Sequence, residues 1–565
     1  MVITTELKYE FFDKIIGKQI LILAANGVDS VCTFKIVTCI FKKFEVSYSY
    51  SIINSKSELQ TTFLKYGKIS NVLLINCGSQ FDVIEFLNIK ESDNRVIYIL
   101  DSQRPIHVNN FYNASQVKIL TLQEQFGYVP EFHDVFADEV ESDESESDDD
   151  SYQSAKRTKL DAAYLEEKIR RREWKSKRAE IMDIYERYAF HGTSSSLIIY
   201  SLCTLIYQES LELLWCAIIG HTSQLLLNFI NRESYCNMLD LLQSYLCKLV
   251  SERKESKKNN LSEINLQSTD ELALWLYRHW SLKQAVYCTP VTLTNFQLYR
   301  ISDKRLREFL VYMGIPHSEF EAKFSCVRYD LRSEIVSLFK DNYERFNISK
   351  EDLFLPSFVA KCGFREELSA IDATFIIAAF LDHENPEIKE EFCDKFLRAV
   401  KFLSINDSRT IDYGLELAKD YIETIYKFTR SILETSDVTV CGTFLQVDVK
   451  KQNPLWLSAP LMQYILPRYI LEATYSQRPK LGKSRKTQSL PLIINAESRT
   501  DKSLILYGIP PLKSDKSKNP FGQIFEDSLI CAKSRIQQDF FDTCKIKINE
   551  GDTLKIFQAI RRFLS

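Results

Sequence analysis

The side chains with the clearest chemical potential follow three apolar segments in the first hundred residues. Asp29, Asn76 and Asp101 each stand at or just after the end of such a segment. Carboxylates held together at the ends of parallel strands could bind a pair of divalent metal ions and promote phosphodiester hydrolysis. Hard cations of this kind need several oxygen ligands, so the number of acids at these positions decides whether the chemistry is available.

The three apolar segments are nearly continuous in Ile, Leu and Val, which predicts buried strands over Gln19–Ala25, Asn71–Cys77 and Arg95–Asp101. Ser30–Phe44 and Phe81–Ile89 fit the helices that connect them. Strand–helix–strand spacing predicts a parallel sheet with helices on both faces. Ligands of such sheets bind beyond the carboxyl ends of the strands, where the polar residues stand.

The rest of the chain is mostly helical by its periodicity. A long helix is predicted from about Leu160 to His191-Gly192, very basic over Lys168–Arg178, after which Thr193 or Ser194 could cap the next helix. Ser196–Ile230 is predicted to be a buried helical pair, and a polar linker follows at Ser251–Asn260. Further helices are predicted over Leu272–Val286, Lys304–Tyr312, Arg332–Phe346 and Leu415–Leu433, and then strands over Val438–Val447, Leu490–Asn495 and Ser503–Gly508.

Composition excludes several classes of protein. Gly and Pro make up only 29 of 565 residues, which favours long helices over turn-rich β folds. No apolar run approaches the roughly 18 residues of a membrane span, and the N-terminus lacks a signal-peptide core. The 14 cysteines form no CxxC pair and the seven histidines are dispersed, so buried thiols are favoured over a zinc site. We therefore expect a cytosolic or nuclear protein.

The net charge of -4 is the sum of a strongly acidic segment and a basic remainder of the chain. Residues 138–150 contain nine acids and no base, which leaves the remaining chain at +5. Such a segment cannot fold, because like charges repel and nothing apolar is available to bury. Ser145 and Ser147 are each followed three residues on by Asp and suit an acid-directed kinase. The alternative is a solvated spacer.

Seven segments, in one order along the chain, together resemble the cell division control protein 45 family, which is related to the DHH phosphoesterases typified by RecJ. They are Asp101–Tyr112, Arg172–Trp174, His191–Ser195, Leu276–Leu282, Lys304–Pro316, Tyr413–Lys419 and Leu506–Pro511. The resemblance implies an α/β fold with a DHH-like parallel-sheet lobe, a helical interdomain insertion and a smaller DHHA1-like C-terminal α/β lobe. The expected boundaries are 1–132 with 161–235 for the inactivated first lobe, 133–160 for a disordered acidic loop, 236–330 for the helical partner-binding insertion, and 331–565 for a helical connection and the last lobe.

The resemblance also identifies the remnant of an active site. DHH enzymes supply Asp-x-Asp, a later Asp, Asp-His-His and an Asp in a helical segment. The corresponding positions here are Gly27-Val28-Asp29, Asn76, Asp101-Ser102-Gln103 and Ser223. Only two carboxylates remain, which would leave two divalent cations poorly neutralised. We expect no metal, no cofactor and no catalysis, with Asp29 and Asp101 hydrogen-bonded to loops or capping helices.

What the family implies is a non-catalytic scaffold subunit of the nuclear CMG replicative helicase, bridging GINS and the MCM ring for initiation and elongation of DNA replication. The implied partners are the MCM hexamer, the GINS complex, replication-origin loading factors, DNA polymerases and, weakly and without sequence preference, single-stranded DNA. No membrane contact is expected. The rival functions are an active RecJ-like metal-dependent single-strand exonuclease, and a single-strand binding module that keeps the groove without the chemistry.

Three groups of residues are candidates for contacts, each with a plain alternative. Partner contacts are expected in the insertion, or else core packing, at Tyr277, Arg278, His279, Trp280 and Leu282. DNA contacts, or else solvated positions, are expected at Arg104, Lys480, Lys483, Arg485 and Lys486. A bipartite nuclear import signal, or else the wet face of a helix, is expected at Lys156, Arg157, Arg170, Arg171 and Arg172.

Overall fold

The computed structural model describes residues 2–564 except 4–5, 123–126, 137–156, 256–263, 299–303, 347, 363–365, 384–390, 405–406, 436, 450–458, 478–489, 498–502, 513–517 and 534–538. The acidic segment with Ser145 and Ser147, the import candidate Lys156 and the DNA candidates Lys480, Lys483, Arg485 and Lys486 lie outside the described residues. The roles expected of them stay predictions.

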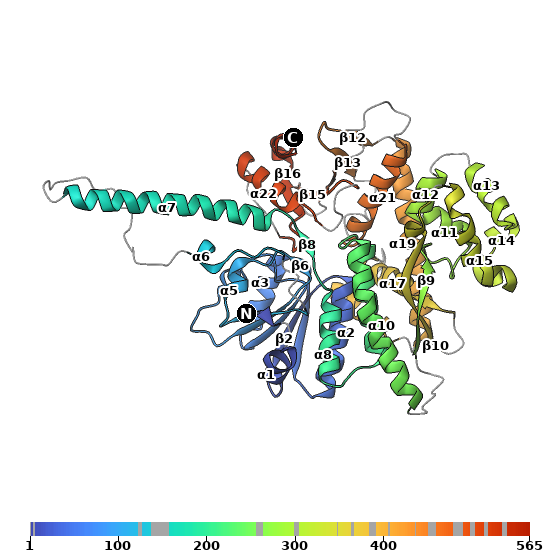
Figure 1. The fold of residues 1–565 in the computed structure, drawn as a ribbon, viewed down its shortest axis with the longest axis horizontal. Coiled ribbons are helices and arrows are strands. Elements are labelled where there is room, and N and C mark those ends of the chain that lie inside the picture. Colours follow the sequence, from blue (N-terminus) through green and yellow to red (C-terminus); the bar gives the residue numbers. More distant parts are fainter. Residues whose placement is uncertain are drawn as a thin grey trace.

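The first lobe contains a six-stranded parallel sheet, in the strand order β1-β7-β5-β4-β2-β3 (Figure 1). Its strands are β1 Val2–Ile3, β2 Ile20–Ala25, β3 Tyr48–Ile53, β4 Asn71–Ile75, β5 Val96–Leu100 and β7 Val117–Leu120. All five pairings are parallel. The three predicted strands and the parallel sheet are confirmed, and β3 is a strand that the sequence analysis missed.

Alternate residues of β2 enter two different cores, because successive side chains of a strand point to opposite faces. Ile20, Ile22 and Ala24 pack with α2 Val28–Lys43, α8 Ser195–Leu205 and α9 Leu211–Leu226. Leu21 and Leu23 pack with α3 Lys56–Lys65 and α4 Val83–Phe86 on the other face. Helices on both faces and the buried helical pair are therefore confirmed, although α4 is much shorter than the predicted Phe81–Ile89.

One helix of 30 residues, α7 Arg157–Glu186, extends away from the body of the molecule (Figure 1). The chain returns from it through β8 Phe190–His191, which pairs with β6 Gln103–Arg104, directly beyond the carboxyl end of β5. This returning segment delivers the start of α8 to the edge of the sheet where Asp29 and Asn76 stand.

The middle of the chain is helical around one antiparallel sheet, β9 Ile264–Leu272 with β10 Phe354–Cys362 and β11 Leu368–Ser369. The longer helices are α10 Arg232–Glu255, α11 Leu282–Cys288, α12 Pro290–Phe296, α13 Lys304–Met313, α15 Tyr329–Asn342, α17 Ala370–Asp382, α18 Phe392–Phe402 and α19 Ser408–Thr435, and the short ones are α14 His317–Glu321 and α16 Lys350–Leu353. The predicted helix over Leu272–Val286 is wrong in its first half, because Leu272 ends β9 and the chain then turns. Leu276 has a left-handed φ of 54°. Its apolar neighbours are buried, so their spacing resembles that of a helix although the chain is not helical there.

A five-stranded mixed sheet closes the fold, in the order β12-β13-β14-β15-β16. Its strands are β12 Val438–Val440, β13 Leu445–Val449, β14 Leu492–Glu497, β15 Ser503–Ile509 and β16 Lys545–Asn549. α22 Phe521–Ala532 and α23 Thr553–Phe563 pack on one face, and α21 Met462–Gln477 packs on the other. The predicted strand Val438–Val447 is two strands separated by a turn at Gly442. The mixed α/β fold class is confirmed.

Within the described ranges, no helix combines the length and the apolar character needed to cross a bilayer.

Candidate functional site at the carboxyl edge of the parallel sheet

Asp29 stands in the first turn of α2, beyond the carboxyl end of β2. Its carboxylate accepts hydrogen bonds from the backbone N–H groups of Ser195 (2.9 Å) and Ser196 (3.1 Å) at the start of α8. Burial raises the pKa of this carboxyl, although the hydrogen bonds it accepts act in the opposite direction. Asp29 on α2 therefore caps α8, while the predicted cap Ser194 occupies the N-cap position but its side chain accepts no capping bond from the helix backbone.

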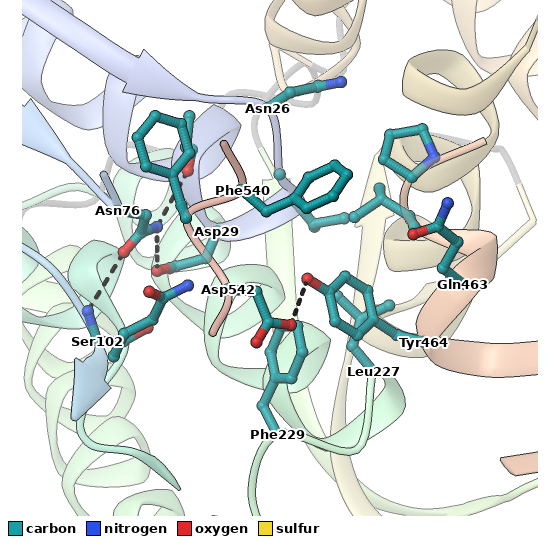
Figure 2. Close-up of a pocket in the computed structure, with 18 of the residues that line it drawn as sticks. Asn26, Asp29, Asn76, Ser102, Leu227, Phe229, Gln463, Tyr464, Phe540 and Asp542 are labelled. Atoms are coloured by element: carbon teal, nitrogen blue, oxygen red, sulfur yellow. Dashed lines mark hydrogen bonds between the residues drawn. The ribbon is translucent and has the colours of Figure 1, made fainter. Parts of the chain in front are cut away.

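Asn76 connects three segments from a left-handed backbone conformation, with φ of 54°. Its side-chain N–H groups donate to Asp29 Oδ2 (3.1 Å) and Ser30 Oγ (3.0 Å). Its side-chain oxygen accepts from Ser195 Oγ (2.7 Å) and from the backbone N–H of Ser102 (3.3 Å). Figure 2 shows this amide between Asp29 and Ser102. An amide serves here because it donates and accepts at once, which a carboxylate cannot do.

Asp101 is 2% exposed and stabilises the two loops beside it. Oδ2 accepts from the backbone N–H of Gly78 (3.1 Å), the backbone N–H of Ser79 (3.1 Å) and Ser79 Oγ (2.9 Å). Oδ1 accepts from the backbone N–H of Gln103 (2.9 Å). Both oxygens are thus occupied by donors, as the loop-binding interpretation of this residue predicts.

Ser223 and Gly220 complete the edge from α9. Ser223 Oγ donates to Gly220 O at 2.7 Å. A Cβ on Gly220 would lie 2.1 Å from Ser196 Oγ and 2.6 Å from Asp29 Oδ1. Glycine is therefore needed for α9 to approach the Asp29 network this closely.

Two histidines lie near this edge, of which His191 is half-buried and His221 is buried. His191 stacks on Phe229 with ring centroids 4.2 Å apart and faces Ser102 Oγ through Nδ1 at 3.3 Å. His221 stacks on Tyr235. Burial lowers the pKa of each imidazole to about 4, so both are neutral at pH 7 and pack as aromatic rings.

The edge faces the last lobe across a cleft with a volume of about 370 Å³. Asp29, Asn76, Gln103 and Ser223 line one side of it, which confirms that the fold brings these predicted residues together, while Asp101 lies behind the lining. The opposite side carries residues that no motif indicated, because they come from α21, from β16 and from the loop before β16: Gln463, Tyr464, Phe540, Phe541, Asp542 and Lys545 (Figure 2).

The loop before β16, residues 539–544, crosses from the last lobe to the first. Asp539 accepts from the backbone N–H of Lys56 through its own carbonyl (2.8 Å). Its carboxylate accepts from Ser57 N–H (2.8 Å) and Ser57 Oγ (3.0 Å). Asp539 thus caps the N-terminus of α3, and the loop holds the two lobes together over the sheet edge.

Asp542 and Lys545 are the charged groups that the last lobe places in the cleft. Asp542 accepts from Tyr464 Oη (3.0 Å) and from the backbone N–H of Cys544 (2.8 Å). Lys545 Nζ lies 3.8 Å from the Tyr464 ring centroid and 5.3 Å from that of Tyr507. Burial lowers the pKa of Lys545 to about 8 although Asp542 favours its charged form.

The residues at this edge do not fit a pair of divalent cations. A metal ligand must offer free oxygen lone pairs, whereas the oxygens of Asp29 and Asp101 face backbone N–H and hydroxyl donors. Across the described ranges, no three His, Cys, Asp or Glu side chains gather where they could hold a metal ion. The hydrogen bonds of Asp29 and Asp101 instead join α2, α8 and two loops.

The proposed partner motif is an interior feature of the middle segment. Tyr277, His279, Trp280 and Leu282 are buried, and Trp280 Nε1 donates to Trp275 O at 3.0 Å. Arg278 makes a two-pronged ion pair with Glu271 at 2.5 and 2.9 Å. Burial favours the core-packing interpretation of the four buried residues, since a partner cannot reach side chains that the chain itself covers, while Arg278 is half-buried and engaged by Glu271.

His279 is buried between two carboxylates, of which Asp372 is buried and Glu366 is exposed. Its Nε2 lies 3.4 Å from Asp372 Oδ2, and its Nδ1 lies 3.6 Å from Glu366 Oε2. The first contact has the distance of an ion pair but not the geometry of a hydrogen bond. Burial acts to lower the pKa of His279, but the two carboxylates outweigh it and the pKa is raised. The cluster ties residues 274–281 to α17.

Two further predictions meet the structure here. Arg104 is 1% exposed and donates to the carbonyls of Asp101 and Gln103, both at 2.8 Å. This burial argues against the predicted contact between Arg104 and DNA. Arg170, Arg171 and Arg172 are exposed within α7, and Arg157 lies in its first turn. The exposed positions of Arg170, Arg171 and Arg172 on a continuous helix fit a solvated helix face, and the import signal stays a prediction.

Known proteins of one family match this sequence along almost the whole chain. The profile of the family described as CDC45 matches residues 20–127 and 130–561. A Mus musculus relative described as cell division control protein 45 homolog is 30% identical over 576 residues, covering 99% of this chain and 100% of the relative. The Saccharomyces cerevisiae cell division control protein 45 is 23% identical over 626 residues, covering 94% of each chain.

One solved structure has the same fold over its whole length. The crystal structure of CDC45 from Entamoeba histolytica superposes with a TM-score of 0.70 at 18% identity and covers 100% of both chains. RecJ in complex with Mn²⁺ from Thermus thermophilus reaches a TM-score of 0.42 at 9% identity, covering 98% of this chain and 53% of that one. The second value is too low to support an argument about the site.

Proposed function

The chain belongs to the CDC45 family, and from that premise we propose that it is a non-catalytic scaffold subunit of the CMG replicative helicase, bridging the GINS complex and the MCM ring. Membership in this family supports a role in DNA replication. The nuclear location, the two partner complexes and the bridging role are the finer parts of the proposal. In it, the fold supplies pre-formed surfaces for binding.

The observation that carries the non-catalytic part is the hydrogen bonding of Asp29 and Asp101. Each is the acid that remains at its motif, and each accepts bonds from backbone N–H groups of neighbouring segments. A residue engaged in this way stabilises the fold instead of holding a catalytic metal. Because these carboxylates join neighbouring segments of the fold, we propose that the protein acts as a scaffold.

We propose that the partner surface consists of exposed residues of the middle segment, since most of the motif expected to form it is buried. Val311 and Tyr312 on α13 are 79% and 59% exposed, and Tyr329 on α15 is 74% exposed. Large apolar and aromatic side chains of this kind are typical anchors of protein interfaces. Arg345 lies over the Tyr312 ring at 5.3 Å from its centroid, which adds an anchor of the other common type.

Co-purification with GINS and MCM subunits, followed by cross-link mapping, tests the scaffold. We expect cross-links on α13 and α15 and expect Val311→Asp with Tyr312→Asp to lower recovery of at least one partner complex. Leu554→Asp on α23, a position that is 78% exposed, is the matched control. Cross-links confined to other elements would move the partner surface, and no co-purification would contradict the scaffold role.

A nuclease assay separates this function from the rival exonuclease. Purified protein is incubated with labelled single-stranded DNA and Mn²⁺. We expect no metal-dependent release of nucleotides above that of Asp101→Ala. Release that Asp101→Ala abolishes would establish catalysis and refute the non-catalytic proposal.

A further inference from the structure

A second cavity lies where the C-terminal end of α7 meets α3 and α22 (Figure 1). Its volume is about 660 Å³, which lies within the about 300–1,000 Å³ range of small-molecule sites. Lys56 comes from α3 and Phe81 from the loop before α4, while Glu186 ends α7 and Glu526 lies on α22. Among the described residues, this cavity and the cleft at the sheet edge share no lining residue.

Lys56 is the first residue of α3 and is only 9% exposed. Its Nζ lies 5.1 Å from the centroid of the Phe81 ring. In the described part of the chain, this ammonium has no hydrogen-bond acceptor and no carboxylate within ion-pair distance. Nζ is nevertheless not sealed from solvent, so a molecule in the cavity can reach it. A buried ammonium without a counter-ion is costly, which indicates that a ligand brings an anionic group to it.

Carboxylates also line the cavity, and most of them have no partner. They are Asp82, Glu85, Glu186 and Glu526. Asp82 is engaged, because it caps the N-terminus of α4. The side chains of the three glutamates meet no cation and no hydrogen-bond donor within the described ranges. The cavity therefore combines one unpaired ammonium with several unpaired carboxylates.

Glu186 and Glu526 come from different elements and lie close enough to influence each other. The pKa of Glu186 is raised to about 7 by its removal from water and by the negative charge of Glu526. Burial and Asp527 raise the pKa of Glu526, whereas Lys56 acts to lower it. A cation placed between the two glutamates would relieve their repulsion. The same cavity thus offers a place for a cationic group and a place for an anionic one.

We infer that this cavity binds a zwitterionic ligand of the arginine type, with its carboxylate on Lys56 and its guanidinium between Glu186 and Glu526. A guanidinium pairs with carboxylates through two parallel hydrogen bonds and stacks on aromatic rings. Phe81 and Phe86, with ring centroids 4.9 Å apart, supply that aromatic surface.

Ligands with a single sign of charge fit this lining less well. A simple cation is repelled by Lys56, and a simple anion, including a phosphate, is repelled by the three glutamates. The ligand is therefore free arginine or the last residue of a polypeptide that ends in arginine, since both present a carboxylate and a guanidinium. The site is independent of the bridging role, because the described residues that line it include none from α13 or α15.

Isothermal titration calorimetry of the full chain with arginine tests the inference. We expect saturable binding of arginine and about tenfold weaker binding of two analogues. Citrulline replaces the guanidinium by a neutral group, and agmatine lacks the carboxylate. Equal affinities for arginine and either analogue would overturn the inference, because one of the two charges would then play no part. Absence of arginine binding up to about 10 mM, a very weak limit, would overturn it as well.

Substitution of Lys56 separates the two charges of the ligand. Lys56→Met should weaken arginine binding about tenfold and should strengthen agmatine binding, because the ammonium that repels this cation is gone. Glu526→Gln should weaken both. Lys65→Met is the matched control, since Lys65 is exposed at the other end of α3 and outside the cavity lining. Weakening of both ligands by Lys56→Met would contradict the inference, and thermal melting of each variant reports its folding independently.

A short peptide identifies the source of the arginine. Tighter binding of Ala-Ala-Ala-Arg than of free arginine, lost when the peptide carries a C-terminal amide, would assign the site to a chain terminus. Tighter binding of free arginine would assign it to the amino acid. Undiminished binding of the amidated peptide would overturn the inference, because Lys56 would then not hold a carboxylate.

Discussion

Asp29 accepts hydrogen bonds from the backbone N–H of Ser195, 166 residues later in the sequence, at 2.9 Å. A residue that stands where a metal ligand would be expected thus joins α2 to the start of α8. The bond is buried, so its loss leaves N–H groups without a partner instead of exposing them to water.

Replacement of Asp29 should therefore destabilise the fold. Asp29→Ala removes the acceptor for Ser195 N–H, Ser196 N–H and the Asn76 amide, and we expect a loss of about 2–3 kcal/mol in the free energy of unfolding. Asp29→Asn keeps one acceptor oxygen and should lose less. Urea denaturation measures both. A change below about 0.5 kcal/mol for Asp29→Ala would contradict the structural role.

We expect Gly220→Ala to destabilise the fold, which is the opposite of the usual effect of this substitution in a helix. Alanine in place of a helical glycine normally stabilises by up to about 1 kcal/mol. Here the added Cβ meets Ser196 Oγ at 2.1 Å and Asp29 Oδ1 at 2.6 Å, so overpacking should outweigh propensity and cost about 1–2 kcal/mol net. Gly551→Ala is the control, since a Cβ there meets nothing within 4 Å. Equal melting temperatures for the two variants would contradict the close approach of α9.

The His279 cluster should make stability depend on pH. The pKa of His279 is raised by Asp372 and Glu366 in the folded state, so the imidazolium stabilises the fold fully below its unfolded pKa of about 6.5 and progressively less as pH rises through the folded pKa. The pKa values of His191 and His221 are about 4, so these residues stay neutral in that window.

The difference between wild type and His279→Gln isolates this contribution from other titrating groups, including Lys545. We expect wild type to lose stability relative to the variant as pH rises from about 6.5 upward, measured as urea midpoints at several pH values. A constant difference across the window would show that His279 does not change its charge there.

Asp382 repeats the capping arrangement of Asp29 at a second helix. It accepts from Leu461 N–H (3.1 Å) and Met462 N–H (2.8 Å) at the start of α21 and from Tyr421 Oη (2.8 Å) on α19. Burial raises its pKa to about 6. Tyr421→Phe should cost about 1 kcal/mol and Asp382→Ala about 3 kcal/mol.

The double variant tests whether the two residues act together. Its loss in the free energy of unfolding should fall short of the sum of the single losses, because one hydrogen bond is removed in both. Strict additivity in urea denaturation would show that the Tyr421 hydroxyl stabilises the fold through some other contact.

The first sheet could be predicted from the sequence because its strands are buried on both faces. Continuous Ile and Leu in Ile20–Ala25, Asn71–Ile75 and Val96–Leu100 leave a signal that does not depend on distant residues. The positions of Asp29, Asn76 and Gln103 at one edge of the sheet could be predicted from these strands, because parallel strands end at the same edge. β9 gave no such signal: its sequence is half polar, and its partner β10 lies about 90 residues away.

The far wall of the cleft was equally hidden. Phe540, Phe541, Asp542 and Lys545 form no motif, and they reach the first sheet only because β16 is the last strand of another sheet. Asn26 is visible in the sequence as a residue after a strand, but its lack of partners depends on every neighbour around it. Local patterns place an amide at the edge; the tertiary structure decides whether it is satisfied.

The loop at residues 539–544 also sets an order of events during synthesis. Asp539 caps α3, which ends at Lys65, and Lys545 begins the strand that completes the last sheet. A ribosome-bound chain that has already formed its parallel sheet must wait through more than four hundred further residues before this cap and the far wall of the cleft arrive. Until residues 539–544 have been synthesised, the N-terminus of α3 lacks this cap and the sheet edge lacks its facing wall.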